Sequence, residues 1–388
     1  LQRVIQFASL CRRAASYNAR VNPYDILVRG AGAVGLTAAL ALSRQGWRVA
    51  LLGAAALPAV DDVRAYALNR SSVALLQSLK VWDAIPDNAR TPVFDMHVQG
   101  DAPGATLDFS AWTQSLGELA WIVDAAELEA ALRTAARFAP HVCAVDREVP
   151  ATLQVLAEGK DSATRARLGV HMPRQAYGQR GIAARLVASQ PHAGLARQWF
   201  RSPDVLALLP LDRPRAGHGL GLVWSVPDAR ADELMALPEA DFLAALMDAS
   251  QGAAGNLSLA SARAQWPLSL ARAERVCGPG WVLVGDAAHV VHPLAGQGLN
   301  LGLADVAALA EVLAGREPWR PLADTRLLQR YARRRIGPTL AMAGLTDGLL
   351  QLFASPAPLA RELRNRGLSL VNHLTPLKRL LAARALDG

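Results

Sequence analysis

The stretch Gly285-Asp-Ala-Ala-His-Val-Val-His-Pro-Leu-Ala-Gly-Gln-Gly-Leu-Asn-Leu-Gly302 indicates the fold of this chain more clearly than any other. It lies between the apolar run 281–284, which predicts a short buried strand, and residues 299–313, whose apolar residues recur at helical spacing. Glycines at 296, 298 and 302 let the backbone approach a planar ring, and the first amides of the helix point toward negative charge. The turn is therefore predicted to hold a flat ligand on which negative charge develops, such as a reduced flavin.

Asp286 follows the predicted strand directly. Open α/β sheets bind ligands at the carboxyl ends of their strands, so this carboxylate is expected to accept hydrogen bonds from the hydroxyls of a sugar-like chain. The alternative is an ordinary glycine-rich connection. The coincidence of an acid, a proline and several glycines between a strand and a helix argues against that alternative.

A second glycine pattern lies near the start of the chain. The apolar run 25–28 predicts a strand, Gly30, Gly32 and Gly35 follow at GxGxxG spacing, and residues 36–43 continue as an apolar helix. Residues 47–52 predict the next strand, and this context is typical of a dinucleotide-binding turn. The pattern alone does not distinguish FAD from NAD, but together with the first stretch it indicates FAD.

This second pattern departs from the usual fingerprint in two places. The second strand normally ends in a carboxylate that binds the adenosine ribose, whereas here Leu52 is followed by Gly53 and three alanines. Arg29 stands in the turn where a small residue is usual. Either the ribose is held another way, or the affinity for the adenine half is reduced. Losing one charged hydrogen bond costs roughly 1.5 to 3 kcal/mol, so weakened binding is expected in preference to abolished binding.

With both ends of the chain considered, the sequence resembles the FAD-dependent hydroxylases of ubiquinone biosynthesis, within the para-hydroxybenzoate hydroxylase-like class A flavoprotein monooxygenases. The resemblance runs from about Asp25 to the C-terminus. Besides the two glycine patterns, it rests on the following stretches taken together: Asp62–Leu68, Ser72–Asp83, Tyr177–Gln179, Leu206–Leu211, Val223–Ser225, Tyr331–Arg335 and Leu345–Leu349.

The resemblance implies roles for individual residues. Asp286 would hold the ribityl chain of FAD, and Arg64 would bring positive charge to the pyrophosphate. The remaining implied cofactor residues are the pyrophosphate glycines Gly30, Gly32 and Gly35, and the residues lining the isoalloxazine ring, Pro293, Gly296, Gln297, Gly298, Leu299 and Asn300. A third family signature occurs as Glu158-Gly159 with Ser162 and Arg165, and has Glu where Asp is usual. No residue identifies itself as catalytic.

The expected fold is α/β: a Rossmann-like FAD-binding domain with an inserted antiparallel-sheet substrate domain and C-terminal helices. The expected boundaries are 1–24 for an N-terminal extension, 25–164 and 276–388 for the two parts of the FAD-binding domain, and 165–275 for the substrate domain. In the insertion, runs 182–187, 205–209 and 220–226 predict strands, and one helix is expected near 239–247. A long helix over 324–353 is expected to kink at Gly337-Pro338.

Segment 138–157 is short for this family. It can supply one strand near 141–145 and another near 152–156, at about 3.3 Å per residue. Family members build several antiparallel strands here, so we expect part of that sheet to be absent. Together with Gly53 and Glu158, this shortage leaves open a degenerate, weakly active or non-catalytic member.

The resemblance implies an FAD-dependent monooxygenase. NADPH or NADH would reduce the flavin, and one atom of O2 would be transferred to a (poly)prenylated phenol or benzoquinone precursor of ubiquinone. The first alternative is a non-catalytic scaffold in a complex with other quinone-biosynthesis enzymes. A third interpretation is a flavin-dependent reductase of prenyl chains, which needs no oxygen.

Composition narrows the partners and the location. The chain has 41 Lys and Arg against 33 Asp and Glu, but the arginines are dispersed and aromatic residues make up only 5%, so nucleic acid is not expected. Residues 361–384 mix leucines with basic residues, which suits either a peripheral membrane contact or a solvated face. Four arginines and no acid in residues 1–24 suit either a mitochondrial transit peptide, giving a matrix protein, or an extension of a bacterial protein of the cytoplasm or inner membrane face. His289 and His292 lack further ligands nearby in sequence, so no metal site is expected.

Overall fold

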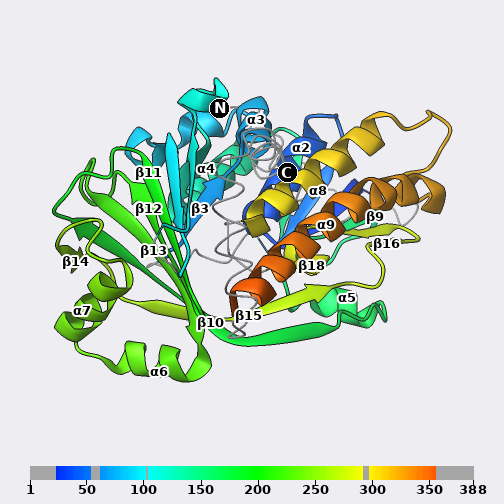
Figure 1. Ribbon diagram of the computed structural model, residues 1–388. Coiled ribbons are helices and arrows are strands. Elements are labelled where there is room, and N and C mark those ends of the chain that lie inside the picture. Colours follow the sequence, from blue (N-terminus) through cyan, green and yellow to red (C-terminus); the bar gives the residue numbers. More distant parts are fainter. Residues whose placement is uncertain (1–22, 54–61, 102–103, 292–296, 355–388) are drawn as a thin grey trace.

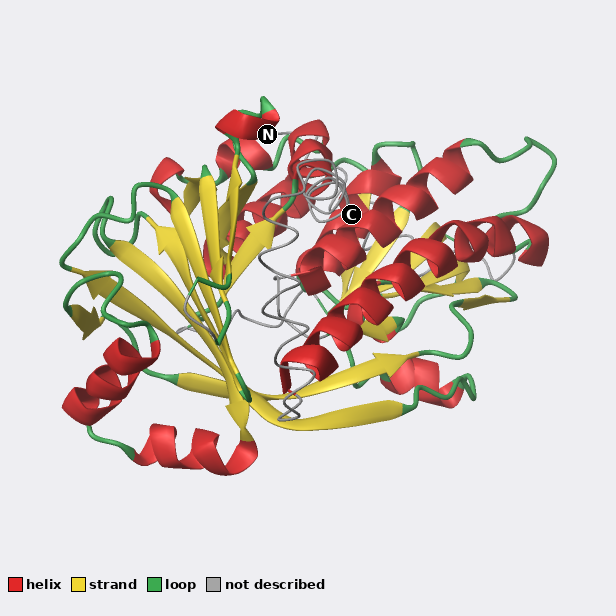
Figure 2. Cartoon of the chain, in the orientation of Figure 1, coloured by secondary structure: helices red, strands yellow, loops and turns green. Residues whose placement is uncertain are grey.

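A computed structural model describes residues 23–53, 62–101, 104–291 and 297–354. It has the expected α/β class: a parallel sheet covered by helices and a larger, mainly antiparallel sheet lie side by side (Figure 1). Long strand β10 (Arg174–Ala188) runs from the first part of the molecule into the second. The two layers of strands and the helices packed on them can be followed by colour in Figure 2.

The first sheet carries the dinucleotide pattern. Its strand order is β16 (Cys277–Gly278), β17 (Trp281–Leu283), β9 (Ala151–Leu156), β1 (Tyr24–Arg29), β2 (Val49–Leu52) and β8 (Val142–Val145). The strands run parallel except for the pair β16 and β17. As predicted, segment 138–157 supplies only β8 and β9, and both join this parallel sheet.

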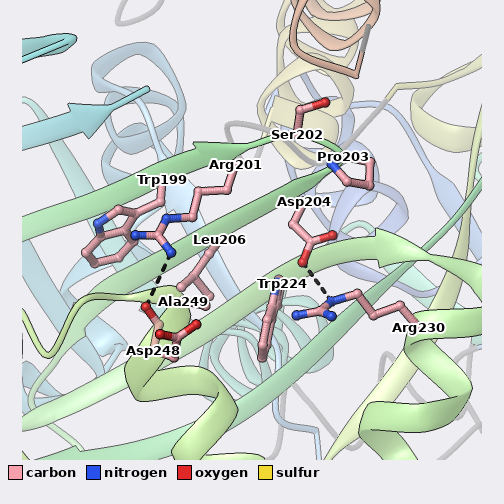
Figure 3. Close-up of a pocket in the computed structure, with 10 residues that line it drawn as sticks. All are labelled: Trp199, Arg201, Ser202, Pro203, Asp204, Leu206, Trp224, Arg230, Asp248 and Ala249. Atoms are coloured by element: carbon pink, nitrogen blue, oxygen red, sulfur yellow. Dashed lines mark hydrogen bonds and ion pairs between the residues drawn. The ribbon is translucent and has the colours of Figure 1, made fainter. Parts of the chain in front are cut away.

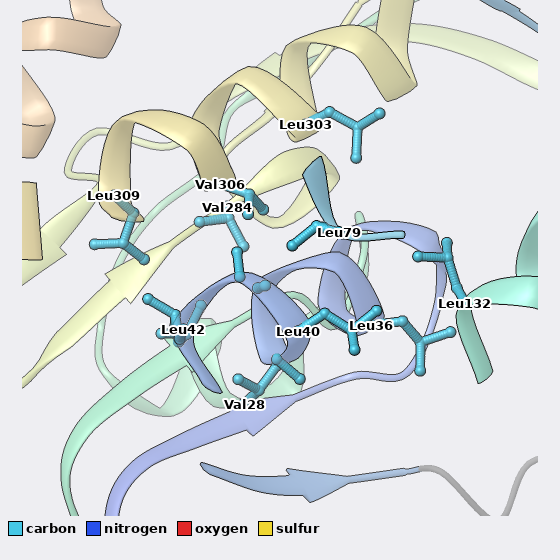
Figure 4. Packing of buried hydrophobic residues seen from close by; sticks show 14 of the residues in the cluster. Val28, Leu36, Leu40, Leu42, Leu79, Leu132, Val284, Leu303, Val306 and Leu309 are labelled. Carbon is cyan, nitrogen blue, oxygen red and sulfur yellow. The ribbon is translucent and has the colours of Figure 1, made fainter. Parts of the chain in front are cut away.

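Helix α2 (Ala33–Ser43) forms the centre of the first core. It is apolar on all sides because it packs between the sheet, α4 (Ala125–Phe138) and α8 (Gln297–Ala314). Figure 4 shows Leu36, Leu40 and Leu42 of α2 beside Leu132 of α4 and residues of α8. Helix α9 (Thr325–Ala354) packs on α8. It continues through Pro338, and a kink there stays a prediction.

The second sheet has nine strands. They are β18 (His289–Val290), β15 (Ala264–Arg272), β10, β13 (Gly219–Pro227), β12 (Asp204–Leu211), β11 (Leu195–Arg201), β5 (Asp95–Gln99) and β6 (Thr106–Ser110), with β14 (Leu257–Leu259) on β10. The three predicted strands lie within β10, β12 and β13. Strands β5, β6 and β18 come from outside the range 165–275, and β5 pairs with β11 in parallel.

Two helices follow β13, where only one was expected. Helix α7 (Glu239–Ala249) confirms the helix predicted near 239–247, but α6 (Asp228–Ala236) was missed, so the prediction of a single helix is wrong. The reason is that α6 buries only Ala231 and Leu234, which leaves too few apolar residues for a visible helical period.

A small antiparallel sheet consists of β3 (Ala65–Leu68), β7 (Ala120–Asp124) and β4 (Arg90–Val93). It contacts α8 of the first part through β3 and strand β12 of the second sheet through β4 and β7. Helix α3 (Arg70–Ser78), the short helix α5 (Ala163–Arg167) and the single turns η2 (Trp82–Ala84), η3 (Asp87–Ala89), η4 (Trp112–Gln114) and η5 (Gly285–Ala287) complete the described elements. Within the part of the chain that the structure describes, no helix has both the length and the apolar character needed to cross a bilayer.

Candidate functional site

Five parallel strands of the first sheet end at one level. The register places Val145, Leu52, Arg29, Leu156 and Leu283 beside one another in the order β8, β2, β1, β9, β17. Both glycine-rich turns therefore leave the sheet at the same edge, although they are about 250 residues apart in the sequence. This is the edge at which open α/β sheets bind ligands.

The three glycines of the first turn do different work. Gly30 has a φ of +100°, and a Cβ there would overlap the carbonyl oxygen of Ala157. A Cβ on Gly35 would overlap the carbonyl oxygen of Gly30, so this glycine lets α2 pack on its own turn. Gly32, in contrast, begins α2 with nothing within 4 Å of its Cβ position and no side chain capping the helix. The unsatisfied first amides of α2 beside this open space suit a pyrophosphate.

The turn after β17 packs directly on the first turn. A Cβ on Gly302 would lie 2.6 Å from Cγ2 of Val34 and 3.2 Å from the Cα of Gly285. This glycine therefore lets α8 pack against α2 and η5, and its approach to a ring stays a prediction. Gly298 has nothing within 4 Å of its Cβ position, so space remains open at the start of α8.

Asp286 lies in η5, immediately beyond the end of β17. Solvent reaches its side chain, and its carboxylate forms no hydrogen bond with another residue that the structure describes. Burial by surrounding protein atoms raises its pKa, and the positive groups of His289, Lys160 and Arg64 offset this only in part. An accessible acceptor with cations around it suits a polyhydroxyl chain joined to a phosphate.

Asp305, on α8, holds the Asp286 turn in place. Its carboxylate is fully buried and accepts hydrogen bonds from the backbone N–H of Gly285 at 2.9 Å, from Nε2 of His289 at 2.7 Å and from Nε of Arg335 at 2.6 Å. Burial alone would raise its pKa, but the charges and hydrogen bonds of His289 and Arg335 outweigh it and lower the pKa. Tyr331 adds a hydrogen bond from its hydroxyl to the carbonyl oxygen of Leu283 at 2.7 Å.

Sequence reasoning missed Asp305. The available signal was an acid within the apolar helix predicted over 299–313, where a charged residue needs buried partners. Its partners could not be identified from the sequence, because Arg335 lies 30 residues away on another helix.

The third signature ties a neighbouring loop to the same turn. Arg165 is buried, and it donates from Nη1 to the carbonyl oxygen of Ala287 at 3.0 Å and from Nη2 to that of Lys160 at 2.9 Å. The carboxylate of Glu158 accepts hydrogen bonds from the hydroxyls of Ser162 at 2.5 Å and Thr164 at 2.8 Å. Glu158 is thus occupied at the start of α5, whereas Arg165 positions the turn that carries Asp286.

Arg64 lies close to this edge, but its charge is shared. Its Nε donates to Oδ1 of Asp62 at 2.8 Å, and its Nη2 lies 3.6 Å from Glu129. These partners, Asp62 first, raise the pKa of the guanidinium. The Arg64 guanidinium also lies 5.6 Å from the ring centroid of Tyr66, and burial raises the pKa of that phenol to about 12. A contribution of Arg64 to a pyrophosphate stays a prediction.

Asn300 directs its side chain into the protein. Its Oδ1 accepts hydrogen bonds from the backbone N–H of Asn69 at 3.1 Å and the hydroxyl of Ser72 at 2.8 Å, and its Nδ2 donates to the carbonyl oxygen of Ala67 at 2.8 Å. Its amide oxygen accepts two hydrogen bonds and its Nδ2 has one donor hydrogen beyond the bond to Ala67, so the side chain mainly joins protein segments. Leu299 is half-buried and Gln297 opens α8. Pro293 and Gly296 lie outside the described residues.

The two departures at the dinucleotide turn have separate outcomes. Arg29 is buried, donates from Nε to Oε1 of Gln154 at 3.1 Å and pairs with Glu148, so it serves the interior of the protein. Gly53 has a φ of +97° and carries no acceptor at the end of β2.

The described residues contain no group of three or more His, Cys, Asp or Glu arranged for a metal ion, and His292 lies outside them.

A separate pocket of about 270 Å³ lies in the second sheet (Figure 3). Its polar groups are already paired in part: Asp204 meets Arg230 at 2.9 Å, and Arg201 donates to the carbonyl oxygen of Asp248 at 3.4 Å. The pocket is formed by β11 to β13 with α6 and α7, which Figure 1 shows at the opposite end of the molecule from α5 and β16. It is not part of the glycine-turn edge.

Comparisons with known proteins agree with this geometry. Residues 23–154 and 122–342 match a family described as FAD binding domain. The chain is 31% identical to the ubiquinone hydroxylase UbiL of Rhodospirillum rubrum, over 93% of this chain and 89% of the relative. It is 30% identical to the 3-demethoxyubiquinol 3-hydroxylase of Escherichia coli, over 92% and 97% of the two chains. The crystal structure of p-nitrophenol 4-monooxygenase PnpA from Pseudomonas putida shares the fold, with a TM-score of 0.74 at 19% identity over 94% and 98% of the chains.

Proposed function

Because the chain belongs to the FAD-binding-domain family of flavin-dependent monooxygenases, we propose that it hydroxylates a (poly)prenylated phenol or benzoquinone precursor of ubiquinone. FAD is the cofactor, and NADPH or NADH would serve as the electron donor with O2 as the co-substrate. The observation that carries the proposal is the meeting of the Gly32 turn and the Asp286 turn at one edge of the sheet. The similarity to two ubiquinone-pathway hydroxylases along more than nine tenths of the chain supports the substrate class.

Bound FAD would supply the redox and oxygen-transfer chemistry of the reaction. The chain's own part is to bind and orient. The open N-terminus of α2 at Gly32 would receive the pyrophosphate, and Asp286 would accept hydrogen bonds from the ribityl hydroxyls. The start of α8, from Gln297 to Asn300, would direct backbone amides toward the ring, where they favour negative charge.

We assign the substrate to the second sheet. Residues 25–164 and 276–388 would form the FAD-binding part and residues 165–275 the substrate part. Strands β5, β6 and β18 lie outside 165–275 in the sequence but complete the sheet of the substrate part. The second sheet meets the small sheet through apolar residues, with Ala196 and Leu211 buried against Val93 and Ile122. Such a surface suits an apolar aromatic substrate, because most small-molecule sites are apolar with a few polar groups. A prenylated substrate also fits a protein that works at a membrane surface, of the bacterial cytoplasm or of the mitochondrial matrix.

The test combines the purified protein with genetics. The protein should carry flavin absorbance and oxidise NADPH or NADH faster when a prenylated phenol is added. Under labelled oxygen gas, one labelled atom should enter the product, whereas a prenyl reductase would incorporate none. Expression should restore ubiquinone in a strain lacking the matching hydroxylase, with quinone intermediates profiled by mass spectrometry.

The contrary outcome is equally specific. A folded, colourless protein that co-purifies with other quinone-biosynthesis enzymes and fails to restore ubiquinone would replace the hydroxylase with a scaffold. The Asp286→Ala variant is the internal control, since it should lose restoration while remaining folded.

A further inference from the structure

One residue follows the end of each of the five parallel strands before the chain turns away. Beyond Val145, Leu52, Arg29, Leu156 and Leu283, the next residues are Asp146, Gly53, Gly30, Ala157 and Val284. At three of these positions a backbone hydrogen bond to the neighbouring strand is still present. The N–H groups of Gly30, Ala157 and Val284 donate to the carbonyl oxygens of Leu52, Arg29 and Leu156, in that order. Asp146, Gly53 and Gly30 therefore follow the ends of three neighbouring strands, β8, β2 and β1.

Asp146 brings a carboxylate to the place where β2 lacks one. The last residue of β8, Val145, is paired with the last residue of β2, Leu52. Neighbouring strands lie about 4.8 Å apart, so Asp146 leaves the sheet about one strand spacing from the end of β2 and about two from the end of β1. The dinucleotide turn places a pyrophosphate at Gly32, and a nucleoside ribose attached to it extends along the edge toward β2 and β8. An acid at the end of β8 therefore faces the same edge as one at the end of β2, one strand spacing farther along it.

The Asp146 side chain is available for a ligand. It is exposed, and it forms no hydrogen bond or ion pair with any other described residue. The nearby acids are occupied: Glu148 pairs with Arg29 and Arg167, and Glu158 accepts the hydrogen bonds at the start of α5. Among the described acids that follow β8 and β9 at this edge, Asp146 alone both comes directly after the strand paired with β2 and is unpaired.

We propose that Asp146 takes the place of the missing β2 carboxylate and accepts hydrogen bonds from the ribose hydroxyls of the adenosine half of FAD. This inference rests on the proposed function only in requiring that FAD binds. It gives the short segment 138–157 a role, because β8 leads directly into the turn that carries the acid. The departure at Gly53 then moves the ribose ligand from one strand to its neighbour.

The test separates the two halves of the cofactor. The full-length protein is stripped of flavin, and the affinities of FAD and of FMN, which lacks the adenosine half, are measured by flavin fluorescence. For Asp146→Ala we expect FAD to bind about tenfold or more weakly, because a charged acceptor is lost. The affinity for FMN should change by less than about twofold, within ordinary variation for an exposed site. Asp146→Asn, which keeps one acceptor oxygen, should fall between wild type and Asp146→Ala for FAD.

A matched control is Asp241→Asn, which removes an exposed acid on α7 in the second sheet region and should change neither affinity. Unchanged FAD affinity in Asp146→Ala would overturn the inference and leave the hydroxylase proposal standing. An equal loss for FAD and FMN would also overturn it, because the effect would not lie in the adenosine half. A wild-type protein that binds no flavin would overturn the proposed function and this inference together.

Discussion

The carboxylate of Asp305 accepts a hydrogen bond from Nε2 of His289 at 2.7 Å, with both side chains buried. His289 stands three residues after Asp286, and Asp305 stands on α8, so this contact joins the Asp286 turn to the helix that begins beside it. The same carboxylate holds Arg335 of α9 at 2.6 Å. One buried acid thus connects a turn and two helices behind the proposed flavin edge.

Removal of this acid should destabilise the protein strongly. Asp305→Ala leaves the buried Arg335 guanidinium and His289 without their acceptor, and the loss of one partner of a buried pair costs about 3 to 5 kcal/mol. The free energy of unfolding, measured with denaturant, checks this. Glu311→Ala is the control: it breaks the exposed pair with Arg334 between the same two helices and should cost less than about 1 kcal/mol. Equal losses in the two variants would contradict the role given to Asp305.

Lowering the pH should remove the contribution of the Asp305 carboxylate to the free energy of unfolding. The pKa of Asp305 is lowered in the folded protein, so its contribution to stability is fully present above the unfolded value of about 3.9 and is lost as the pH falls through the lower folded value. Other carboxylates add to the acid sensitivity of the protein, and the difference between wild type and Asp305→Asn isolates this one. We expect the difference in unfolding free energy between the two proteins to shrink as the pH is lowered below about 4. A difference independent of pH would argue against an ionised Asp305.

Asp286→Ala should separate cofactor binding from folding. The carboxylate forms no hydrogen bond within the described protein, so its removal opens no core cavity and the flavin-free variant should unfold like flavin-free wild type. FAD should bind about tenfold or more weakly, because the ribityl hydroxyls lose a charged acceptor. Flavin content after purification and the FAD dissociation constant measure the effect. An unfolded variant beside a stable flavin-free wild type would contradict this placement of Asp286.

Alanine substitutions at two glycines of one turn should affect different properties, stability in one case and FAD affinity in the other. Gly35→Ala forces a methyl group onto the backbone of Gly30, and such overpacking should cost about 1 to 3 kcal/mol of stability. Gly32→Ala meets open space at a φ of −76°, so stability should change by no more than about 1 kcal/mol while FAD affinity falls. Thermal unfolding of the flavin-free proteins and FAD titrations measure the two effects. Full FAD affinity in Gly32→Ala would contradict a pyrophosphate at this position.

Much of the fold was predictable because its signals are local. The strands around 25–28, 47–52 and 281–284 and the helices around 36–43 and 299–313 are confirmed by β1, β2, β17, α2 and α8. Each of these elements is predicted by its apolar periodicity and by a glycine-rich turn within about 20 residues of it. Helix α6 was missed since only two of its residues are buried, and that signal is too weak to show a period.

The sequence by itself determined the α/β class, the two glycine-rich turns and the acid beyond the last parallel strand, because these depend on residues adjacent in the chain. Only the tertiary structure decided that Asn300 holds Asn69 and Ser72, that Gly302 packs on Val34, and that β8, which leads into Asp146, ends beside β2. These contacts join residues roughly a hundred or more positions apart. Their existence depends on strand order and register, which the packing of the whole core sets and which no local pattern encodes.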